Sequence, residues 1–206
     1  LALKHVLANQ DPNNLDILAT YDHRPSSRKE YDRVSALSLG QIDLRMDWLL
    51  QGRVGAVKTD TLALTAPGDE DLAGTDDQRA FFAYAPRLEQ FVRLLPGGEM
   101  PETARSGVQG EPPELEAIVP VEAADLLDVE VGDTISAVPF IEATSPYARV
   151  KITGIFERID PTDDFWYFYG RSIVAGTVLT VRTLPLFVSE GTYFDVVGLS
   201  FSALES

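Results

Sequence analysis

Cysteine is absent from the 206 residues of this chain, and histidine occurs only twice. Without cysteine there can be no disulfide bond, thiolate zinc site or cysteine nucleophile, although the cellular compartment stays open. His5 and His23 lack a third ligand at metal-binding spacing, and nothing in the sequence places a serine beside either of them. We therefore interpret both as surface or hydrogen-bonded histidines rather than metal ligands or catalytic bases.

Positive charge is scarce as well. The chain has 17 Lys and Arg against 32 Asp and Glu, which gives a formal net charge of -15. Because the basic residues are scattered, a DNA or RNA backbone would be repelled, as would anionic lipid headgroups. An acidic surface mainly keeps a protein soluble. Nucleic acid is therefore not an expected partner.

The common motifs of phosphate binding and serine catalysis are missing. The sequence contains no GxGxxG, no GxxxxGK followed by Ser or Thr, and no GxSxG. We therefore expect no cofactor, and the sequence points to no catalytic residue.

Hydrophobic residues make up 45% of the chain, which is ordinary for a globular protein. The first predicted helix, 28–50, begins with a capping-box pattern at Ser27 and Glu30. Its expected apolar side consists of Tyr31, Val34, Leu37, Leu44 and Trp48. Periodicity predicts further helices at 87–95 and 121–129, with Ala124 and Leu127 of the latter turned inward.

Strands are more numerous than helices. Alternation and β-branched residues predict them at 13–21, 54–66, 80–85, 117–120, 133–143, 148–157, 176–181, 184–190 and 193–201. They follow one another in hairpin-like succession with few parallel βαβ signals, so we predict an α+β fold, β-rich and mixed, with a few helices. We divide it into an N-terminal α+β part, 1–95, and a β-rich part, 96–206, which form one domain or two subdomains.

Two loops concentrate carboxylates. They contain Asp69, Glu70, Asp71, Asp76 and Asp77 in the first and Asp160, Asp163 and Asp164 in the second. Loop carboxylates can bind calcium, but the EF-hand order is absent, so we interpret these residues mainly as solvated turn residues. A paired-carboxylate glycosidase site and a calcium-dependent adhesin domain are the alternatives that these loops leave open.

Five aromatic residues follow one another: Phe165, Trp166, Tyr167, Phe168 and Tyr169. If exposed, this aromatic run would suit a ligand, a partner or a membrane interface. If buried, it would plug one edge of the core. We predict that the aromatic run and the acidic loop at 67–77 face a partner.

The helix at 121–129 ends at Gly132-Asp133, where a strand begins at once. Gly132 can adopt a positive φ at no steric cost. Asp133 can accept a hydrogen bond within its own turn. We predict a structural turn that needs no chemistry. The order of helix, V-G-D and strand also occurs in small double-psi barrels.

The neighbourhood of this turn resembles a known family. AIVPVEAADLLDVEVGDTISAVPF, followed by ARVKITGIFERIDPTDDFW, closely resembles the large extracytoplasmic domain of MacB/FtsX-type ABC transporter permeases. The matching residues are Ala123, Ala124, Leu127, Val131, Gly132, Asp133, Val150, Ile152, Gly154, Ile155, Phe156, Asp160, Pro161, Asp163 and Trp166, together with Gly98 and Pro101 of an earlier G-x-x-P segment. The resemblance covers about 94–188, and the part before it carries no diagnostic motif.

The resemblance implies a MacB-like periplasmic core domain that catalyses no reaction itself. It would lie on the extracytoplasmic side of the cell membrane, inserted after the first membrane helix of a permease. Its partners would be an ABC ATP-binding subunit, reached through the transmembrane part, and an exported cargo or an extracytoplasmic protein. The full transporter would be dimeric and would couple ATP hydrolysis to export or to mechanotransmission.

The rival hypothesis is a free-standing soluble ligand-binding or enzymatic domain with a small β-barrel around the V-G-D turn. The chain begins with Leu1 rather than Met, so we expect a piece of a longer chain, with removal of a tag as the alternative. Hydrophobic spans on both sides in the parent gene would favour the permease. Neither the cargo nor the oligomeric state of the isolated domain is specified by the sequence.

Overall fold

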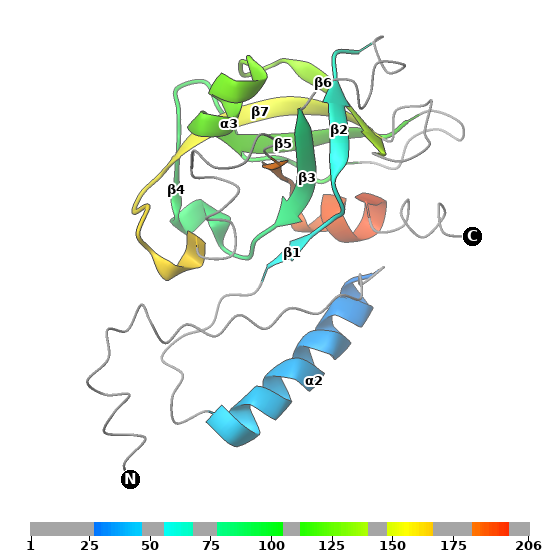
Figure 1. Ribbon diagram of the computed structural model, residues 1–206, viewed down its shortest axis with the longest axis vertical. Helices are drawn as coiled ribbons and strands as arrows, with labels where there is room; N and C mark the ends of the chain where they lie inside the picture. Colours follow the sequence, from blue (N-terminus) through cyan, green and yellow to red (C-terminus); the bar gives the residue numbers. More distant parts are fainter. Residues whose placement is uncertain are drawn as a thin grey trace.

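The structure is a computed structural model that describes residues 27–46, 56–67, 78–104, 112–139, 148–166 and 183–197. The predicted strands at 13–21 and 176–181 lie outside this part. In chain order the elements are α2 (Arg28–Met46), β1 (Val57–Lys58), β2 (Leu62–Thr65), β3 (Arg79–Tyr84), η3 (Leu88–Gln90), β4 (Val92–Leu94), β5 (Glu114–Pro120), α3 (Val121–Leu127), β6 (Thr134–Pro139), β7 (Ala148–Arg158), η4 (Asp164–Trp166), β8 (Thr183–Phe187) and η5 (Thr192–Val197) (Figure 1).

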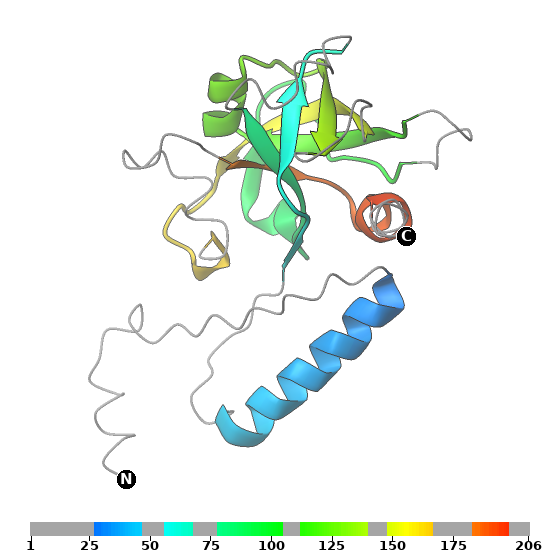
Figure 2. The ribbon, with the colours of Figure 1, turned by 45° about the vertical axis from the view of Figure 1, so that its right-hand side comes forward.

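Six of the described strands form a closed barrel. Neighbours follow the order β3-β2-β6-β7-β5-β8, and β8 pairs with β3 again, which closes the ring (Figures 1 and 2). β1 pairs with the end of β3 along the same edge as β2, and β4 pairs with β7. This mixed sheet with a few helices confirms the predicted α+β class. Strands from both predicted parts, 1–95 and 96–206, share it.

Two of the strand pairs are parallel, which differs from the predicted hairpin-like succession. β5 pairs with β7 in parallel along Glu114–Pro120, and β3 pairs with β8 in parallel along Arg79–Ala83. A parallel pair needs a long connection, and here α3 and β6 lie between β5 and β7. Local alternation of apolar residues is the same in either pairing direction, so the sequence pattern did not reveal it.

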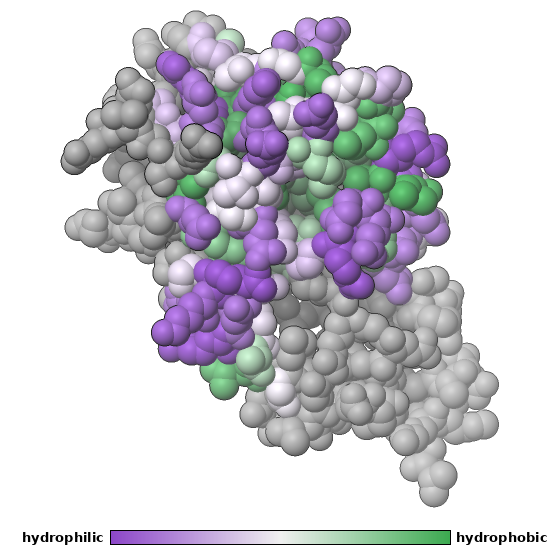
Figure 3. Space-filling view, turned by 180° about the vertical axis from the view of Figure 1, so that it is seen from behind, coloured by the Kyte–Doolittle hydropathy of each residue, from purple (hydrophilic) through white to green (hydrophobic). Residues whose placement is uncertain are grey.

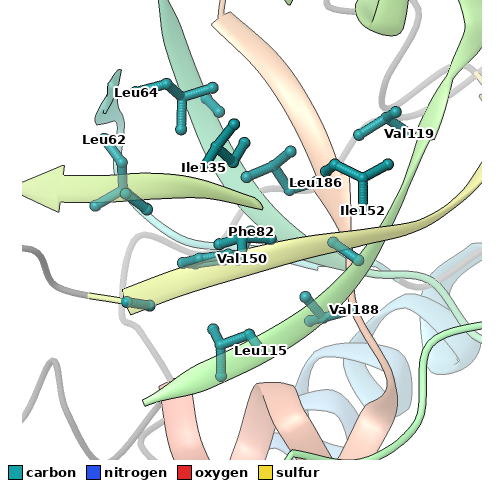
Figure 4. Packing of buried hydrophobic residues seen from close by; sticks show 14 of the residues in the cluster. Leu62, Leu64, Phe82, Leu115, Val119, Ile135, Val150, Ile152, Leu186 and Val188 are labelled. Atoms are coloured by element: carbon teal, nitrogen blue, oxygen red, sulfur yellow. The ribbon is translucent and has the colours of Figure 1, made fainter. Parts of the chain in front are cut away.

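Alternate residues of the six ring strands fill the barrel interior (Figure 4), because successive side chains of a strand point to opposite faces. The buried interior residues of these strands are Leu62, Leu64, Ala80, Phe82, Leu115, Ala117, Val119, Ile135, Ala137, Ala148, Val150, Ile152, Leu184 and Leu186. Small barrels have interiors just wide enough for side chains. The described barrel therefore has a packed core of aliphatic side chains and Phe82.

A bulge in β7 changes the face that its residues use. The register against β5 shifts after Ala117 and leaves Thr153 as an extra residue of β7. One extra residue reverses the in-and-out alternation of a strand. Ile152, before the bulge, belongs to the barrel interior, whereas Phe156, after it, belongs to a second core.

This second core lies on the outer face of the ring. It joins residues of β3, β5, β7 and β8 to residues of η3, β4 and η4, and its aromatic members are Phe81, Phe156, Phe165, Trp166 and Phe187. The ring centroid of Phe156 lies 5.7 Å from that of Phe187 and 6.1 Å from that of Trp166. One side of the barrel wall is thus buried on both faces.

Helical segments lie at opposite ends of the barrel (Figures 1 and 2). α3 follows β5 and buries Ala123, Ala124 and Leu127 against the interior, which confirms the predicted inward residues. Asp128 ends α3 with φ +53, and the carbonyl of Ala124 accepts a hydrogen bond from the N–H of Val129 at 3.2 Å. η5 follows β8 at the other end.

The helix predicted from Arg28 is confirmed as α2 up to Met46, and 47–50 lie outside the described residues. The hydroxyl of Ser27 accepts a hydrogen bond from the N–H of Glu30 at 3.3 Å, which is half of the predicted capping box. Tyr31 packs against the barrel core, but Leu37, predicted on the apolar side, is 67% exposed. The first residues of α2 lie near η5, and the rest of the helix points away from the barrel (Figure 1).

The prediction of a helix at 87–95 is wrong. The segment forms the single turn η3 and then β4, which pairs antiparallel with β7. Arg87 has φ +63, in the left-handed region, so a regular helix does not begin there. Pairing of Val92–Leu94 with the edge of β7 outweighs the helical spacing of the apolar residues.

The prediction of a strand at 193–201 is wrong over 193–197, where η5 is helical. The hydroxyl of Ser189 accepts a hydrogen bond from the N–H of Thr192 at 3.1 Å and so starts the helical turn. Asp195 is exposed, and the residues on the other side are buried: Tyr193, Phe194, Val196 and Val197. This spacing buries one side of a helix and not one face of a strand.

Gly154 of β7 offers a test of the packing around the bulge. A Cβ at Gly154 would lie 2.9 Å from the carbonyl oxygen of Glu99 and from Cγ2 of Ile118, whereas one at Gly40 in α2 would meet nothing within 4 Å. We expect Gly154→Ala to lower the free energy of unfolding by about 1–3 kcal/mol. Gly40→Ala should raise it by up to about 1 kcal/mol, because alanine favours a helix. Urea unfolding measures both, and equal effects would contradict the packing at Gly154.

Candidate functional site

The Gly132-Asp133 turn has a backbone role that the geometry makes explicit. Gly132 has φ +104, and its N–H donates to the carbonyl of Ile152 at 2.7 Å. The carboxylate of Asp133 accepts a hydrogen bond from the N–H of Glu130 at 2.8 Å. The N–H of Ile152 donates to the carbonyl of Asp133 at 2.8 Å. The turn therefore fixes how β6 begins beside β7.

Two segments that carry the family resemblance lie against one another. The N–H of Glu99 donates to the carbonyl of Thr153 at 2.8 Å, so the loop after β4 continues to pair with β7. A Cβ at Gly98 would lie 3.1 Å from the Cα of Gly154. Little space remains for a side chain at either glycine, because the two backbones approach closely.

The aromatic run does not form a partner surface at its first two residues. Phe165 is 1% exposed and Trp166 is 2% exposed, and both belong to the second core. The carboxylate of Asp163 accepts a hydrogen bond from the N–H of Phe165 at 2.8 Å. This turn directs the two rings inward, where Phe165 stacks on Phe91 at 3.9 Å between centroids. Tyr167, Phe168 and Tyr169 lie outside the described residues.

The second acidic loop, which contains Asp160 and Asp163, lies within the described residues and forms the same turn. Asp160 accepts hydrogen bonds from the N–H and the hydroxyl of Thr162 at 2.8 and 2.7 Å, and these bonds lower the pKa of the Asp160 carboxyl. In the described part of the chain, no group of three or more His, Asp or Glu could hold a metal ion. The residues of 68–77, as well as His5 and His23, lie outside that part.

Exposed apolar side chains do not by themselves mark a site. The large ones among the described residues are Leu37, Met100, Leu126, Val131 and Ile159. They belong to different elements, and polar and apolar residues are interspersed over the surface seen from behind (Figure 3). Scattered exposed apolar residues are normal in soluble proteins.

A groove lies at the carboxyl ends of the parallel strands β3 and β8. Its volume is about 420 Å³, and residues 84–89, 100–101 and 188–190 form its walls. In α/β sheets, the carboxyl ends of strands are a frequent place for ligands, because the loops that leave the sheet there supply polar groups. We take this groove as the candidate site of the described part of the chain.

The first turn of α2 is held at the rim of the groove. Glu190 accepts a hydrogen bond from the hydroxyl of Tyr84 at 2.6 Å and forms an ion pair with Arg28 of α2. The guanidinium of Arg28 lies 5.9 Å from the ring centre of Tyr31 and 5.8 Å from that of Phe194. We name these five side chains the Arg28 cluster.

The protonation states in the Arg28 cluster follow from its charges. A hydrogen bond to Asp32, at 2.8 Å, raises the pKa of Arg28 above its usual value. Burial raises the pKa of Tyr84, although the positive charge of Arg28 opposes this shift. At neutral pH, Arg28 is therefore a cation and Tyr84 a neutral hydrogen-bond donor to Glu190.

Sequence reasoning did not identify this cluster. Arg28 was expected only as the start of a helix, and neither Tyr84 nor Glu190 belongs to a motif. The cluster forms because β3 pairs with β8, which brings Tyr84 beside a residue far along the chain. A pattern within one short segment carries no signal for such a contact.

No family model, curated protein or solved structure matches this chain. Within the part that the structure describes, no helix combines the length and the apolar character needed to cross a membrane. The candidate site therefore rests on its own geometry.

The burial of Trp166 can be checked by stability and by fluorescence. Trp166→Ala should lower the free energy of unfolding by about 3–5 kcal/mol, because a large buried side chain is removed. Trp48 is the other tryptophan, so a Trp48→Phe variant leaves Trp166 alone. Acrylamide should quench its fluorescence weakly in the native state and strongly in urea. Strong quenching of the folded protein would restore the partner-surface hypothesis.

Proposed function

We propose that this chain is the extracytoplasmic domain of a MacB/FtsX-type ABC transporter permease. It contributes no catalytic group, and it couples ATP hydrolysis by a cytoplasmic ATP-binding subunit to motion outside the membrane. That motion drives export of a cargo or acts on an extracytoplasmic protein. The full transporter is a dimer at the cell membrane.

One observation carries this proposal: the turn and the glycines of the resemblance meet at one strand, β7. Gly132 and Asp133 are hydrogen-bonded to Ile152 of β7, and Gly98 packs on Gly154 of the same strand. Each acts on the backbone, as a turn residue or as a point of close approach. Residues with such roles specify a rigid scaffold, and a module that transmits motion requires one.

The position of α2 agrees with this function. In the resemblance, the segment before the domain leaves the first membrane helix, so α2 would connect the membrane part to the barrel. α2 meets the barrel through the Arg28 cluster at its first turn. A module that transmits motion must have contacts that differ between two states. An exposed ion pair at the base of a helix is a suitable contact of this kind.

The closed barrel favours the rival function, a ligand-binding or enzymatic domain. Because aliphatic side chains fill the barrel interior, a ligand would have to use the groove at the end of β3 and β8. The groove provides carboxylates and a tyrosine hydroxyl, but its residues match no known catalytic arrangement.

Cysteine labelling of the parent protein distinguishes the two functions. The chain has no cysteine, so Thr134→Cys introduces one exposed thiol into this domain, once any other cysteines of the parent protein are replaced. A membrane-impermeant maleimide should label it in intact cells. Ala137→Cys, at a position that is 0% exposed, is the control and should react only after unfolding.

Labelling of Thr134→Cys only after cell lysis would contradict the permease proposal. The parent gene gives a second check. A span of about 20 apolar residues on each side of this segment is required of a domain inserted between membrane helices.

A further inference from the structure

Glu190 belongs to the groove and to the Arg28 cluster at the same time. Its carboxylate lines the groove and holds both the guanidinium of Arg28 and the hydroxyl of Tyr84. The side chains of Arg28 and Glu190 are 48% and 47% exposed, so water reaches both. A second cation that enters the groove would therefore meet the carboxylate that α2 already uses.

We propose that the groove is a docking site for an extended partner segment that carries an arginine beside apolar residues, and that its binding displaces Arg28 from Glu190. This inference goes beyond the proposed function. It holds for a permease domain and for a free-standing domain alike, so its test and the labelling test can fail separately.

The charges of the groove favour a basic partner. Once Arg28 is displaced, Glu89 and Glu190 contribute two carboxylates to the lining, against the single guanidinium of Arg87. Arg28 demonstrates that Glu190 accepts a guanidinium at this place. The net charge of -15 would attract a basic segment over a longer distance and raise its rate of association.

The remaining walls suit apolar side chains next to the arginine. Pro86, Leu88, Met100 and Pro101 line the groove, and Met100 is 37% exposed. Methionine adapts its shape to different apolar partners. A volume of about 420 Å³ lies within the usual range of ligand pockets.

Displacement of Arg28 requires that its hold on Glu190 be weak enough to exchange. Ion pairs between exposed side chains contribute little, because water competes for both charges. Farther along α2, Leu37 is 67% exposed, and the helix points away from the barrel (Figure 2). The first turn of α2 can therefore leave the groove rim at the cost of the contacts that Tyr31 makes with Phe194.

A peptide titration followed by NMR tests the docking site. The probe is the acetylated, amidated peptide Pro-Leu-Arg-Pro-Leu, and its control replaces the arginine by citrulline, which has the same shape and no charge. We expect the amide signals of Glu89, Ser189 and Glu190 to shift with the arginine peptide. The citrulline peptide should bind about two- to fivefold more weakly, as loss of an exposed charged contact implies.

Three variants separate docking from a general charge effect. Glu190→Gln should weaken binding by about two- to fivefold, whereas Glu157→Gln should change it by less than about 1.5-fold. Glu157 is the matched control, because it is 52% exposed and also pairs with an arginine, Arg93. Arg28→Ala should strengthen binding, since it removes the internal competitor. Absence of binding, equal binding of the citrulline peptide, or unchanged affinity of Arg28→Ala would overturn the proposal.

A distance measurement tests the displacement itself. Because the chain has no cysteine, nitroxide labels at Ala36→Cys on α2 and Thr134→Cys on the barrel report one distance by electron paramagnetic resonance. Saturating arginine peptide should broaden the distance distribution, as Arg28→Ala should without peptide. A distribution that stays unchanged at saturation would show that the peptide binds without releasing α2, and would overturn this part of the proposal.

Discussion

The parallel pairing of β3 with β8 is the contact on which the rest of this structure depends. It joins Arg79–Ala83 to Thr183–Phe187, from opposite halves of the chain, and it closes the six-stranded ring. Closing so long a loop costs conformational entropy, which the aliphatic interior must offset by excluding water. The same pairing aligns the carboxyl ends of the two strands. It therefore creates the groove and brings Tyr84 within hydrogen-bond distance of Glu190.

Two glycines hold β7 in place for different physical reasons. Gly132 has φ +104 and open space around it, so its requirement is conformational. A Cβ at Gly154 would meet the backbone of Glu99 and the side chain of Ile118, so glycine is needed there because space is short. Between them lies the Thr153 bulge, which turns Phe156 from the interior toward the second core. These positions determine where β7 can lie, and the two cores follow from that.

Local sequence patterns were sufficient to predict some of the helices and strands. β3, β5, α3 and β7 agree with the predicted segments, because alternation, helical spacing and the Gly132 turn all act within a few residues. The segments 87–95 and 193–197 were predicted wrongly, because pairing with β7 and burial beside β3 decided their conformation. Barrel closure and the groove depend on contacts between distant segments. The inward direction of Phe165 was readable in principle, since an aspartate two residues earlier commonly caps such a turn.

The scaffold around β7 and the Arg28 cluster have different physical roles. Gly98, Gly132 and Gly154 act on the backbone around β7, whereas the exposed charges of Arg28 and Glu190 lie where no motif marks them. If Arg28 and the arginine of a partner compete for Glu190, linkage requires the effect to be reciprocal. An event that draws α2 away from the barrel would then strengthen binding of the partner in the groove. Binding of the partner would favour release of α2 by the same factor. A groove and a helix that share one carboxylate can thus couple an event outside the domain to the segment that leads into it.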